Sequence, residues 1–330
     1  MRLSKTKSFL KLLNNHDVLY IPRYCYPLIP IAKRLNKKVL VHLHDYQPIS
    51  YNANVPAPYE EFKGEGRIRE WVINVEKTKG FKRYMVASLL WWLPKLAQKW
   101  LMYADTLICV SKRQCDIIMD SMNIIDKDKA IVIYNPVFYK YFDNVKKNPG
   151  DIPTLLYVGG DDFIKGFNVL LQAMKELRRN DKKITIILTN HYSPDSLLKL
   201  NRLKNDRIKI RILGRISYME LIELHKISTV LLFPSIWEEP LPYAVMESMF
   251  AGSIPIASRV GGVPEIVGDT IAEKFMFKPG GVDEFLDRIN AILSLSKEDI
   301  MNISYDLREN ARKKFSEDSI KKSLINMFST

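Results

Sequence analysis

The stretch Leu231–Gly268, LLFPSIWEEPLPYAVMESMFAGSIPIASRVGGVPEIVG, says more about the fold than any other part of the 330-residue chain. The apolar run Val230–Phe233, which overlaps the start of this stretch, predicts a buried strand. The segment Tyr243–Ala251 predicts a helix that begins near Pro242, because proline is favoured at the first helical position. Ligands of doubly wound sheets bind outside the carboxyl ends of the strands, so the loop between this strand and this helix is a candidate site.

Two glutamates of this loop and helix, Glu239 and Glu247, have seven residues between them, and Glu238 precedes the first. A helix N-terminus suits phosphate, because it presents free N–H groups and a positive dipole end. Ionised carboxylates only accept hydrogen bonds and therefore suit sugar hydroxyls. The pattern predicts a ligand with an anionic middle and polyol ends, such as a nucleotide-sugar. On spacing alone, glutamates that lie solvated on the surface are the favoured alternative.

Outward from this stretch, short β-branched runs alternate with amphipathic segments in both directions. This alternation is typical of an α/β fold with parallel sheets. The predicted strands of the first half are Val18–Ile21, Val39–Leu43, Thr106–Val110 and Ala130–Tyr134. Those of the second half are Thr154–Val158, Lys183–Leu188, Ile208–Leu213, Thr229–Phe233, Ile254–Ala257 and Ala272–Phe275.

The polar, two-proline segment Phe142–Pro153 is the predicted linker between two domains. We therefore expect an N-terminal domain over residues 1–145 and a C-terminal domain over 146–315. Residues 316–330 are predicted to form a helix that packs back on the first domain, after a charged segment. The stretch Asp45–Gly66 is predicted to be a long loop, and long loops in compact domains are often functional.

The charge is unevenly distributed along the chain. The net charge is +13, and the first 150 residues carry +12 of it. A basic half indicates an anionic partner, for which the candidates are nucleic acid, a membrane surface or a phosphorylated substrate. No RNA- or DNA-reading motif is present, so nucleic acid is the least favoured of the three.

Composition excludes several other classes of protein. Hydrophobic residues make up 47% and charged residues 26%, which is globular and neither disordered nor fibrous. Three scattered cysteines, Cys25, Cys109 and Cys115, predict a reducing compartment with no disulfide framework and no zinc site. The longest apolar run, Met85–Pro94, is too short to span a bilayer. We expect a cytoplasmic protein without a signal peptide.

A second motif, VGGDDFIKG at Val158–Gly166, lies between a predicted strand and a predicted helix. Gly159 and Gly160 allow close approach of the backbone, and Lys165 could place a point charge on a diphosphate. An ordinary turn with a nearby lysine is the alternative. A third motif, VHLHDY, puts His44 just after a strand, where a ligand-facing residue emerges, although a lone histidine is usually structural.

A fourth segment, Gly80–Asp105, mixes Trp91, Trp92 and Trp100 with several lysines and arginines. Tryptophan and lysine together on an amphipathic helix suit a lipid headgroup interface. A core helix whose aromatic side chains pack on the sheet explains the same residues. Both interpretations remain open from the sequence.

Together these blocks resemble the glycosyltransferases of family 4, in the GT-B superfamily. The resemblance extends from Asp17 to about Phe328 and has four blocks in family order. They are VLVHLHDY with His44, ADTLICVSK, YVGGDDFIKG with Lys165, and the PSIWEEPLPYAVME block from Glu239 to Glu247. The AGSIPIASRVGGVPEIV stretch completes the last block. Each block is modest by itself, and their order is the specific signal.

The resemblance implies a retaining transferase with two Rossmann-like domains facing a cleft, and a nucleotide-diphosphate-sugar as donor. Glu247 would hold the ribose hydroxyls and Lys165 would neutralise the diphosphate. Glu239 and His44 would act at the donor sugar as the catalytic pair. No metal and no cofactor is implied. The remaining positions that the resemblance assigns to donor binding are Gly159, Gly160, Arg215, Leu241, Tyr243 and Ala244.

The chain departs from the family pattern in two ways. Gly160 stands where the family usually has an arginine, and Arg215 is a candidate substitute for the missing charge. The N-terminal domain also lacks the first strand–helix units that the family has, including a Gly-rich loop on the acceptor side. A naturally short protein, a fragment and a partner chain that supplies these elements are all compatible with this difference.

These observations predict sugar transfer to a glycan or lipid-linked acceptor, in cell-surface polysaccharide or glycolipid synthesis. The protein would be peripheral at the cytoplasmic face of an anionic membrane. One alternative is a non-catalytic or partner-dependent subunit that binds a nucleotide-sugar but has an incomplete acceptor site. Another is a GT-B epimerase, which does not account for the paired-glutamate block.

Overall fold

The protein is described by a computed structural model over residues 7–63, 85, 89–90, 92–123, 127–142, 147, 150–179 and 181–329. Contacts divide the chain into two compact units. Unit 1 comprises Met1–Asn135, Glu238–Leu241 and Asp318–Thr330, and unit 2 comprises Pro136–Trp237 and Pro242–Glu317. Part of the predicted linker and Trp91 lie outside the described residues.

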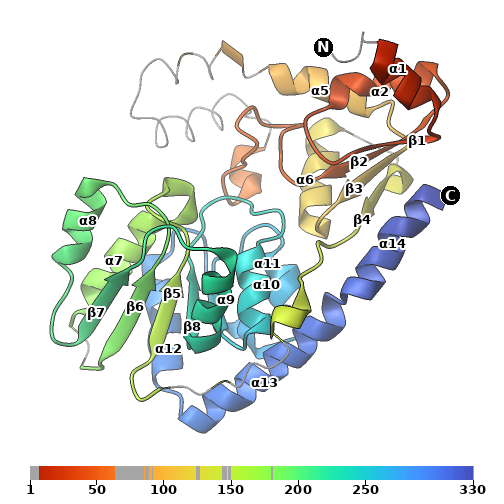
Figure 1. Cartoon of the computed structure of the whole chain (residues 1–330). Coiled ribbons are helices and arrows are strands. Elements are labelled where there is room, and N and C mark those ends of the chain that lie inside the picture. Colours follow the sequence, from red (N-terminus) through yellow and green to blue (C-terminus); the bar gives the residue numbers. More distant parts are fainter. Residues whose placement is uncertain are drawn as a thin grey trace. The chain divides into compact units, whose positions relative to one another are not determined.

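Unit 1 contains a four-stranded parallel sheet in the order β1-β2-β3-β4 (Figure 1). Its strands are β1 (Val18–Ile21), β2 (Lys38–Leu43), β3 (Thr106–Cys109) and β4 (Ala130–Val132). From Val39 to Leu43 every side chain of β2 is buried. Burial on both faces explains why this strand is a continuous apolar run in the sequence.

The helices of unit 1 connect and cover these strands. Those in the described residues are α1 (Lys7–Asn14), η2 (Tyr26–Leu28), α2 (Ile29–Arg34), η3 (Tyr59–Phe62), α5 (Leu93–Leu101), α6 (Lys112–Met122), η4 (Lys127–Lys129) and α14 (Glu317–Ser329). The last helix packs against β1 and β2: Lys38 Nζ donates to the Met327 carbonyl at 2.8 Å, and the rings of Tyr20 and Phe328 lie 5.5 Å apart.

Unit 2 contains a five-stranded parallel sheet in the order β7-β6-β5-β8-β9. The strands are β5 (Thr154–Tyr157), β6 (Ile184–Leu188), β7 (Ile208–Ile212), β8 (Val230–Phe233) and β9 (Ile254–Ala257). The chain winds outward from β5 to β7 and then returns to β8 on the other side of β5. This reversal makes the carboxyl ends of β5 and β8 the topological switch point, where ligands of such sheets bind.

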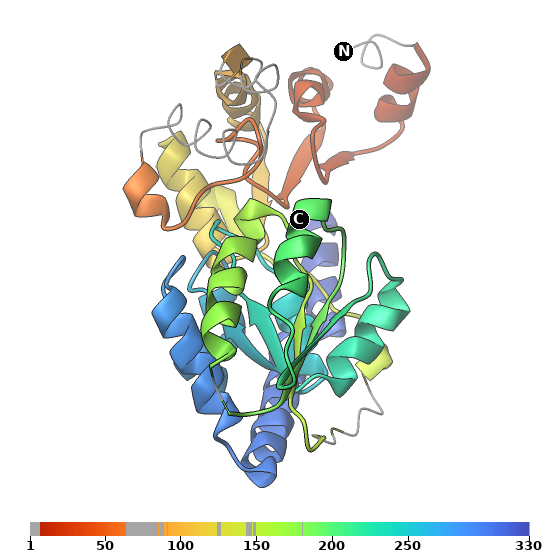
Figure 2. The ribbon, with the colours of Figure 1, turned by 90° about the vertical axis from the view of Figure 1, so that its left-hand side faces the viewer.

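Helices cover both faces of this sheet, as right-handed crossovers require when the order reverses. They are η5 (Tyr139–Phe142), η6 (Phe163–Lys165), α7 (Phe167–Leu177), α8 (Pro194–Asn201), α9 (Tyr218–Ile227), α10 (Tyr243–Phe250), α11 (Val263–Val267), η7 (Ile271–Phe275), α12 (Val282–Leu293) and α13 (Lys297–Lys314). Helix α12 packs against α7, and α13 packs against α10. Figure 2 shows α7 and α12 on one side of the strands and α9 on the other. The predicted α/β fold with parallel sheets is confirmed.

One predicted strand is wrong: Ala272–Phe275 lies within the 3₁₀ helix η7. Thr270 caps this helix, because its hydroxyl accepts a hydrogen bond from the Ala272 N–H. The parallel bridge to the sheet forms two residues later, between Ser258 and Phe277. The apolar residues of the segment are buried by helical packing, which an apolar run by itself does not distinguish from a strand.

The charged segment before the last helix is itself a helix, α13, with 18 residues. It begins with a capping box, in which the Ser296 hydroxyl and the Asp299 carboxylate each accept from the other's backbone N–H. Its buried residues, Ile300, Ser304, Leu307 and Ala311, recur at helical spacing. The capping residues and the helical spacing of these four buried residues are both present in the sequence, and together they predict this helix.

We expect Gly166→Ala to destabilise unit 2. Gly166 has a φ of 74°, and a Cβ at this position would lie 1.7 Å from the Pro234 carbonyl oxygen. The substitution therefore combines left-handed backbone strain with a clash against the backbone that leaves β8. We expect the free energy of unfolding to fall by about 3 kcal/mol or more in urea denaturation.

Gly280→Ala is the matched control, since Gly280 has a similar φ of 77° but nothing within 4 Å of the added Cβ. We expect Gly280→Ala to cost less stability than Gly166→Ala. Equal losses in the two variants would contradict the close approach of Gly166 to Pro234.

Candidate functional site

The loop that follows β5 is built on two glycines that have no room for a side chain. A Cβ on Gly159 would lie 2.4 Å from the Tyr157 hydroxyl oxygen. Gly160 has a φ of 65°, and its Cβ would lie 2.9 Å from the His191 carbonyl oxygen. Gly160 stands where the family pattern has an arginine. The backbone of this chain accepts only glycine at that position.

Lys165 lies at the end of η6, in the same loop. Its Nζ is 5.3 Å from the ring centroid of Trp237, which is the range of a cation–π contact. The Tyr157 hydroxyl donates to the Lys165 carbonyl at 3.2 Å. The lysine is thus held at the carboxyl end of β5 from both its backbone and its side chain.

The loops that leave β5 and β8 are joined by hydrogen bonds at the switch point. The Ile164 carbonyl accepts from the Ile236 N–H at 3.0 Å and from the Ser235 hydroxyl at 3.1 Å. These bonds, together with the close approach at Gly166, fix the Lys165 loop beside the segment that leads into α10.

Glu247 lies one turn into α10 and is almost completely buried, with 4% of its surface exposed. The Tyr218 hydroxyl donates to its Oε1 at 2.9 Å. Burial raises the pKa of Glu247 above its ordinary value, and the bond from Tyr218 opposes this. A carboxylate held in this way is poised to accept hydrogen bonds from a ligand.

His225 lies beside Glu247, with 3.9 Å between its Nε2 and Oε2 of the carboxylate. Burial, helped by Lys147, lowers the pKa of His225 to about 3, so the imidazole is neutral at neutral pH. The pair is therefore not an ion pair at neutral pH. Lys147 is half-buried and donates to the His225 carbonyl and the Ser253 hydroxyl.

The N-terminus of α10 carries Tyr243 and Ala244 at the carboxyl end of β8. Tyr243 is exposed, and the first N–H groups of a helix have no partners within the helix. Arg215 is exposed and follows β7, which is an edge strand separated from β5 by β6. The structure thus brings Gly159, Gly160, Lys165, Tyr243, Ala244 and Glu247 to the switch point and leaves Arg215 two strands away.

In unit 1, His44 follows the carboxyl end of β2 and is exposed. Its ring packs on that of His42, with the centroids 4.2 Å apart. His42 is buried, and its Nδ1 lies 2.7 Å from the Tyr20 hydroxyl oxygen. Burial, together with His44, lowers the pKa of His42 to about 3, and burial also lowers the pKa of His44. Both imidazoles are therefore uncharged at neutral pH.

The adjacent glutamates Glu238 and Glu239 have different surroundings. Glu238 is 2% exposed and is fixed within unit 1, where its Oε1 accepts from the Tyr59 N–H and from Arg113 Nη2, each at 2.8 Å. Arg113 also binds both carboxylate oxygens of Glu60, at 2.8 and 3.0 Å. Glu238 is an anchor for its segment, and Arg113 is the supporting residue that sequence analysis missed.

Glu239 and Leu241 belong to the same short segment of unit 1 as Glu238 and are both buried. The Glu238 N–H donates to the Val55 carbonyl at 2.7 Å, which holds the backbone next to Glu239 in place. Nothing near Arg113 in the sequence points to Glu238, because the two residues are 125 positions apart. Among the residues with described positions, no group of three or more His, Cys, Asp or Glu side chains could hold a metal ion.

Residues 140–314, more than half of the chain, match the family model of the glycosyl transferases group 1. The chain belongs to this family. The matched residues include the loop with Lys165, the helix α10 with Glu247 and the capped helix α13. Apart from Glu238–Leu241, the matched range lies within unit 2, where the sheet order places the switch point.

Curated relatives with detectable sequence similarity include proteins named as glycosyltransferases. The chain is 28% identical over 217 residues to an uncharacterized glycosyltransferase, MJ1607, of Methanocaldococcus jannaschii, over 61% of this chain and 54% of that protein. It is 28% identical over 155 residues to the lipopolysaccharide 1,2-N-acetylglucosaminetransferase of Salmonella typhimurium, over 44% and 40% respectively. The aligned part spans about half the length of these relatives or less.

Solved structures share the fold over nearly the whole chain. HepE of Anabaena, in complex with UDP, superposes with a TM-score of 0.68 at 16% identity, over 98% of this chain and 81% of that one. An E. coli protein titled trehalose-6-phosphate, bound with UDP-2-fluoro glucose, superposes with a TM-score of 0.68 at 12% identity, over 97% and 77%. The group 1 chain therefore has the GT-B fold, with two Rossmann-like units. No helix in its described part is long and apolar enough to cross a membrane.

Proposed function

We propose that the protein is a retaining glycosyltransferase, similar to family 4, that moves a sugar from a nucleotide-diphosphate-sugar to an acceptor. The observation that carries the proposal is the pairing of Lys165 and Glu247 at the switch point of unit 2. One supplies a positive charge for a diphosphate, and the other supplies a buried carboxylate for hydroxyl groups. Structural neighbours that bind UDP or UDP-glucose support this choice of donor class.

In this proposal, Glu247 accepts hydrogen bonds from the ribose hydroxyls, and Tyr218 holds its carboxylate in place. Lys165 neutralises the diphosphate as it leaves. Glu239 stabilises the positive charge that develops on the donor sugar, and the neutral His44 contacts a hydroxyl of that sugar. The acceptor is a glycan or a lipid-linked saccharide of the cell surface, and the reaction needs no metal and no cofactor.

A thermal-shift panel of nucleotide-sugars tests the donor class directly. A ligand that binds only the folded protein raises its melting temperature by mass action. We expect one nucleotide-diphosphate-sugar to raise the melting temperature more than the free sugar or the nucleoside does. A panel in which no member stabilises the protein would overturn the proposal.

The pH dependence of donor binding is expected to follow the protonation of Glu247. Because its pKa is raised, the carboxylate takes up a proton at a higher pH than an ordinary glutamate does, and donor affinity falls as the pH drops through that value. Tyr218→Phe removes the hydrogen bond that lowers this pKa, so affinity should be lost at a still higher pH. Calorimetry with UDP-glucose between about pH 5 and 8 measures the shift.

Glu247→Gln is the control for this titration, because an amide does not ionise in that range. An identical profile for the wild type and for Tyr218→Phe would contradict the role of the tyrosine. A profile that persists in Glu247→Gln would show that another group titrates.

Peripheral binding to anionic membranes is expected from the basic first half. Each Lys or Arg near an anionic surface contributes about 1 kcal/mol, which decays within a Debye length of about 8 Å. We expect co-sedimentation with anionic vesicles that weakens steeply with salt and is absent with neutral vesicles. Equal partitioning on both kinds, or none on either at low salt, would contradict membrane association and favour a soluble glycan acceptor.

A further inference from the structure

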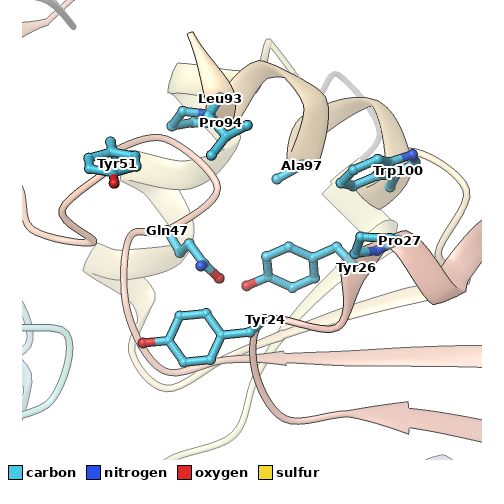
Figure 3. A pocket seen from close by; sticks show the side chains of 9 residues that line it. All are labelled: Tyr24, Tyr26, Pro27, Gln47, Tyr51, Leu93, Pro94, Ala97 and Trp100. Atoms are coloured by element: carbon cyan, nitrogen blue, oxygen red, sulfur yellow. The ribbon is translucent and has the colours of Figure 1, made fainter. Parts of the chain in front are cut away.

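The ring of His225 is a buried polar group that the proposed function does not use. Both of its nitrogens are shielded from solvent and have no hydrogen-bond partner in the described part of the chain. Gln47 also has such an atom, but it lines a cavity of about 310 Å³ in unit 1 (Figure 3), whereas His225 has no exposed surface at all. An unpaired buried polar group costs stability, so this imidazole is a candidate for a functional role.

Helix α9 carries His225 on the face that holds Glu247. Tyr218 and His225 are seven residues apart, which is about two helical turns, so their side chains share one face of the helix. Helix α9 packs against α10, where Tyr218 donates to Oε1 of Glu247 at 2.9 Å and His225 Nε2 lies 3.9 Å from Oε2. One helix thus places a polar side chain beside each oxygen of the carboxylate.

The backbone of His225 is anchored in the last turn of α9. Its carbonyl accepts from the Ser253 hydroxyl at 2.7 Å and from Lys147 Nζ at 3.1 Å. A cation at the carboxyl end of a helix also interacts favourably with the helix dipole. Because the backbone is anchored and the ring is enclosed by protein, the imidazole stays beside Glu247.

The charge state of His225 makes it a hydrogen-bond donor to a carboxylate. Burial, helped by Lys147, lowers its pKa to about 3, so the ring is neutral at neutral pH and carries one N–H. A proton on Nε2 directs this N–H dipole toward Oε2 of Glu247. A proton on Nδ1 would instead place a lone pair opposite the carboxylate. The electrostatics therefore favour the tautomer with the proton on Nε2.

Other titratable groups surround this pair. Burial, together with Glu247, raises the pKa of both Tyr218 and Tyr243, which therefore stay protonated. Desolvation and the nearby Arg308 lower the pKa of Lys147 to about 7. The lysine loses its proton as the pH rises, whereas Glu247 gains one as the pH falls, so the two titrations act in opposite directions of pH.

We propose that His225 is a positioning residue of the donor site, whose neutral imidazole donates from Nε2 to Oε2 of Glu247 and keeps the carboxylate ionised with both oxygens fixed. The separation of 3.9 Å is longer than a hydrogen bond, and a small rotation of the carboxylate completes the contact. The inference rests on the proposed function in taking Glu247 as a group that binds the donor. It goes beyond that function by assigning a role to a residue outside the donor-binding set.

His225→Leu removes the N–H and keeps an enclosed side chain of similar size. We expect it to weaken binding of UDP-glucose about three- to tenfold, the effect of losing one hydrogen bond. The pH below which affinity is lost should also move upward, because the carboxylate loses a bond that favours its charged form. His225→Gln, whose amide N–H reaches the position of Nε2, should recover most of the affinity. Calorimetry between about pH 5 and 8 measures both effects.

The melting temperature distinguishes a positioning role from a merely structural one. Because His225→Leu removes two unpaired buried nitrogens, its melting temperature should equal or exceed that of the wild type. Ile222→Val is the matched control, since Ile222 is fully buried on the same helix and has no polar group. It should lower the melting temperature slightly and leave the pH profile unchanged. A lower melting temperature with an unchanged profile in His225→Leu, or equal shifts of the profile in both variants, would overturn the proposal.

NMR without any donor separates this inference from the proposed function. Nitrogen-15 spectra of the His225 ring and carbon-13 spectra of the Glu247 carboxyl are assigned with His225→Leu and Glu247→Gln. We expect the Nε2–H tautomer throughout the pH range, and a higher pKa of Glu247 in His225→Leu than in the wild type. An Nδ1–H tautomer or an unchanged pKa of Glu247 would overturn the inference even where UDP-glucose binds. The expected spectra in a protein that binds no nucleotide-sugar would contradict the transferase and leave the His225–Glu247 pair.

Discussion

Glu239→Gln should slow turnover roughly 10²- to 10³-fold while it changes donor affinity by less than about threefold. The proposed role of Glu239 is to stabilise charge that exists only in the transition state, so its loss appears in kcat and not in binding. The side chain is buried, which keeps water from screening its charge. Steady-state kinetics together with calorimetric donor binding measures the two effects separately.

The neighbouring residue offers a matched control for this result. Glu238 has the same side chain, but it is bonded to Arg113 and to the Tyr59 N–H. Glu238 is buried and Arg113 is only partly exposed, so removing the charge of Glu238 leaves a poorly solvated arginine, and Glu238→Gln should lower the melting temperature measurably. Equal losses of turnover and donor affinity in Glu239→Gln would contradict a role confined to the transition state.

Glu247→Ala and Lys165→Ala should each weaken binding of UDP-glucose about 10- to 100-fold, as expected for charge-assisted hydrogen bonds worth about 1–3 kcal/mol. The two variants should differ in which part of the ligand they affect. Glu247→Ala should weaken uridine, UDP and UDP-glucose alike, because all three carry the ribose. Lys165→Ala should weaken only the two diphosphates. Calorimetric titration of the three ligands distinguishes these patterns.

Two further variants, one of a lysine and one of an arginine, serve as comparisons for Lys165→Ala. Lys175→Ala removes an exposed charge from α7 and controls for the general loss of positive charge in unit 2. Arg215→Ala shows whether that arginine replaces the cation that the family has at Gly160, although β6 separates its strand from β5. Unchanged donor affinity in both Lys165→Ala and Glu247→Ala would contradict the assignment of the donor site.

Local pattern was sufficient to predict most of the elements. The nine strands in the described part of the chain begin and end within two residues of the predicted runs, because strands buried in a parallel sheet are short, apolar and bounded by turn residues. The same reasoning failed at two places. At Ala272–Phe275 the apolar run forms a 3₁₀ helix and not a strand. In α13 the charged residues outnumber the few buried ones, so the helical pattern was not recognised.

The chemistry at the switch point was also visible in part from the sequence. Gly159, Gly160 and Lys165 follow one predicted strand, and Glu247 follows another, so their meeting required only that the two strands be parallel neighbours. The order β7-β6-β5-β8-β9 is what makes them so. The residue types and the periodicity were local properties, which the sequence displays directly.

What surrounds those side chains was decided only by the tertiary structure. Tyr218 lies 29 residues before Glu247, and Arg113 lies 125 residues before Glu238. Burial and hydrogen bonds at such separations depend on which elements pack together, and no local pattern records that. The sequence therefore determined that acidic groups and a lysine stand at the ends of parallel strands. Only packing made Glu238 an anchor and raised the pKa of Glu247.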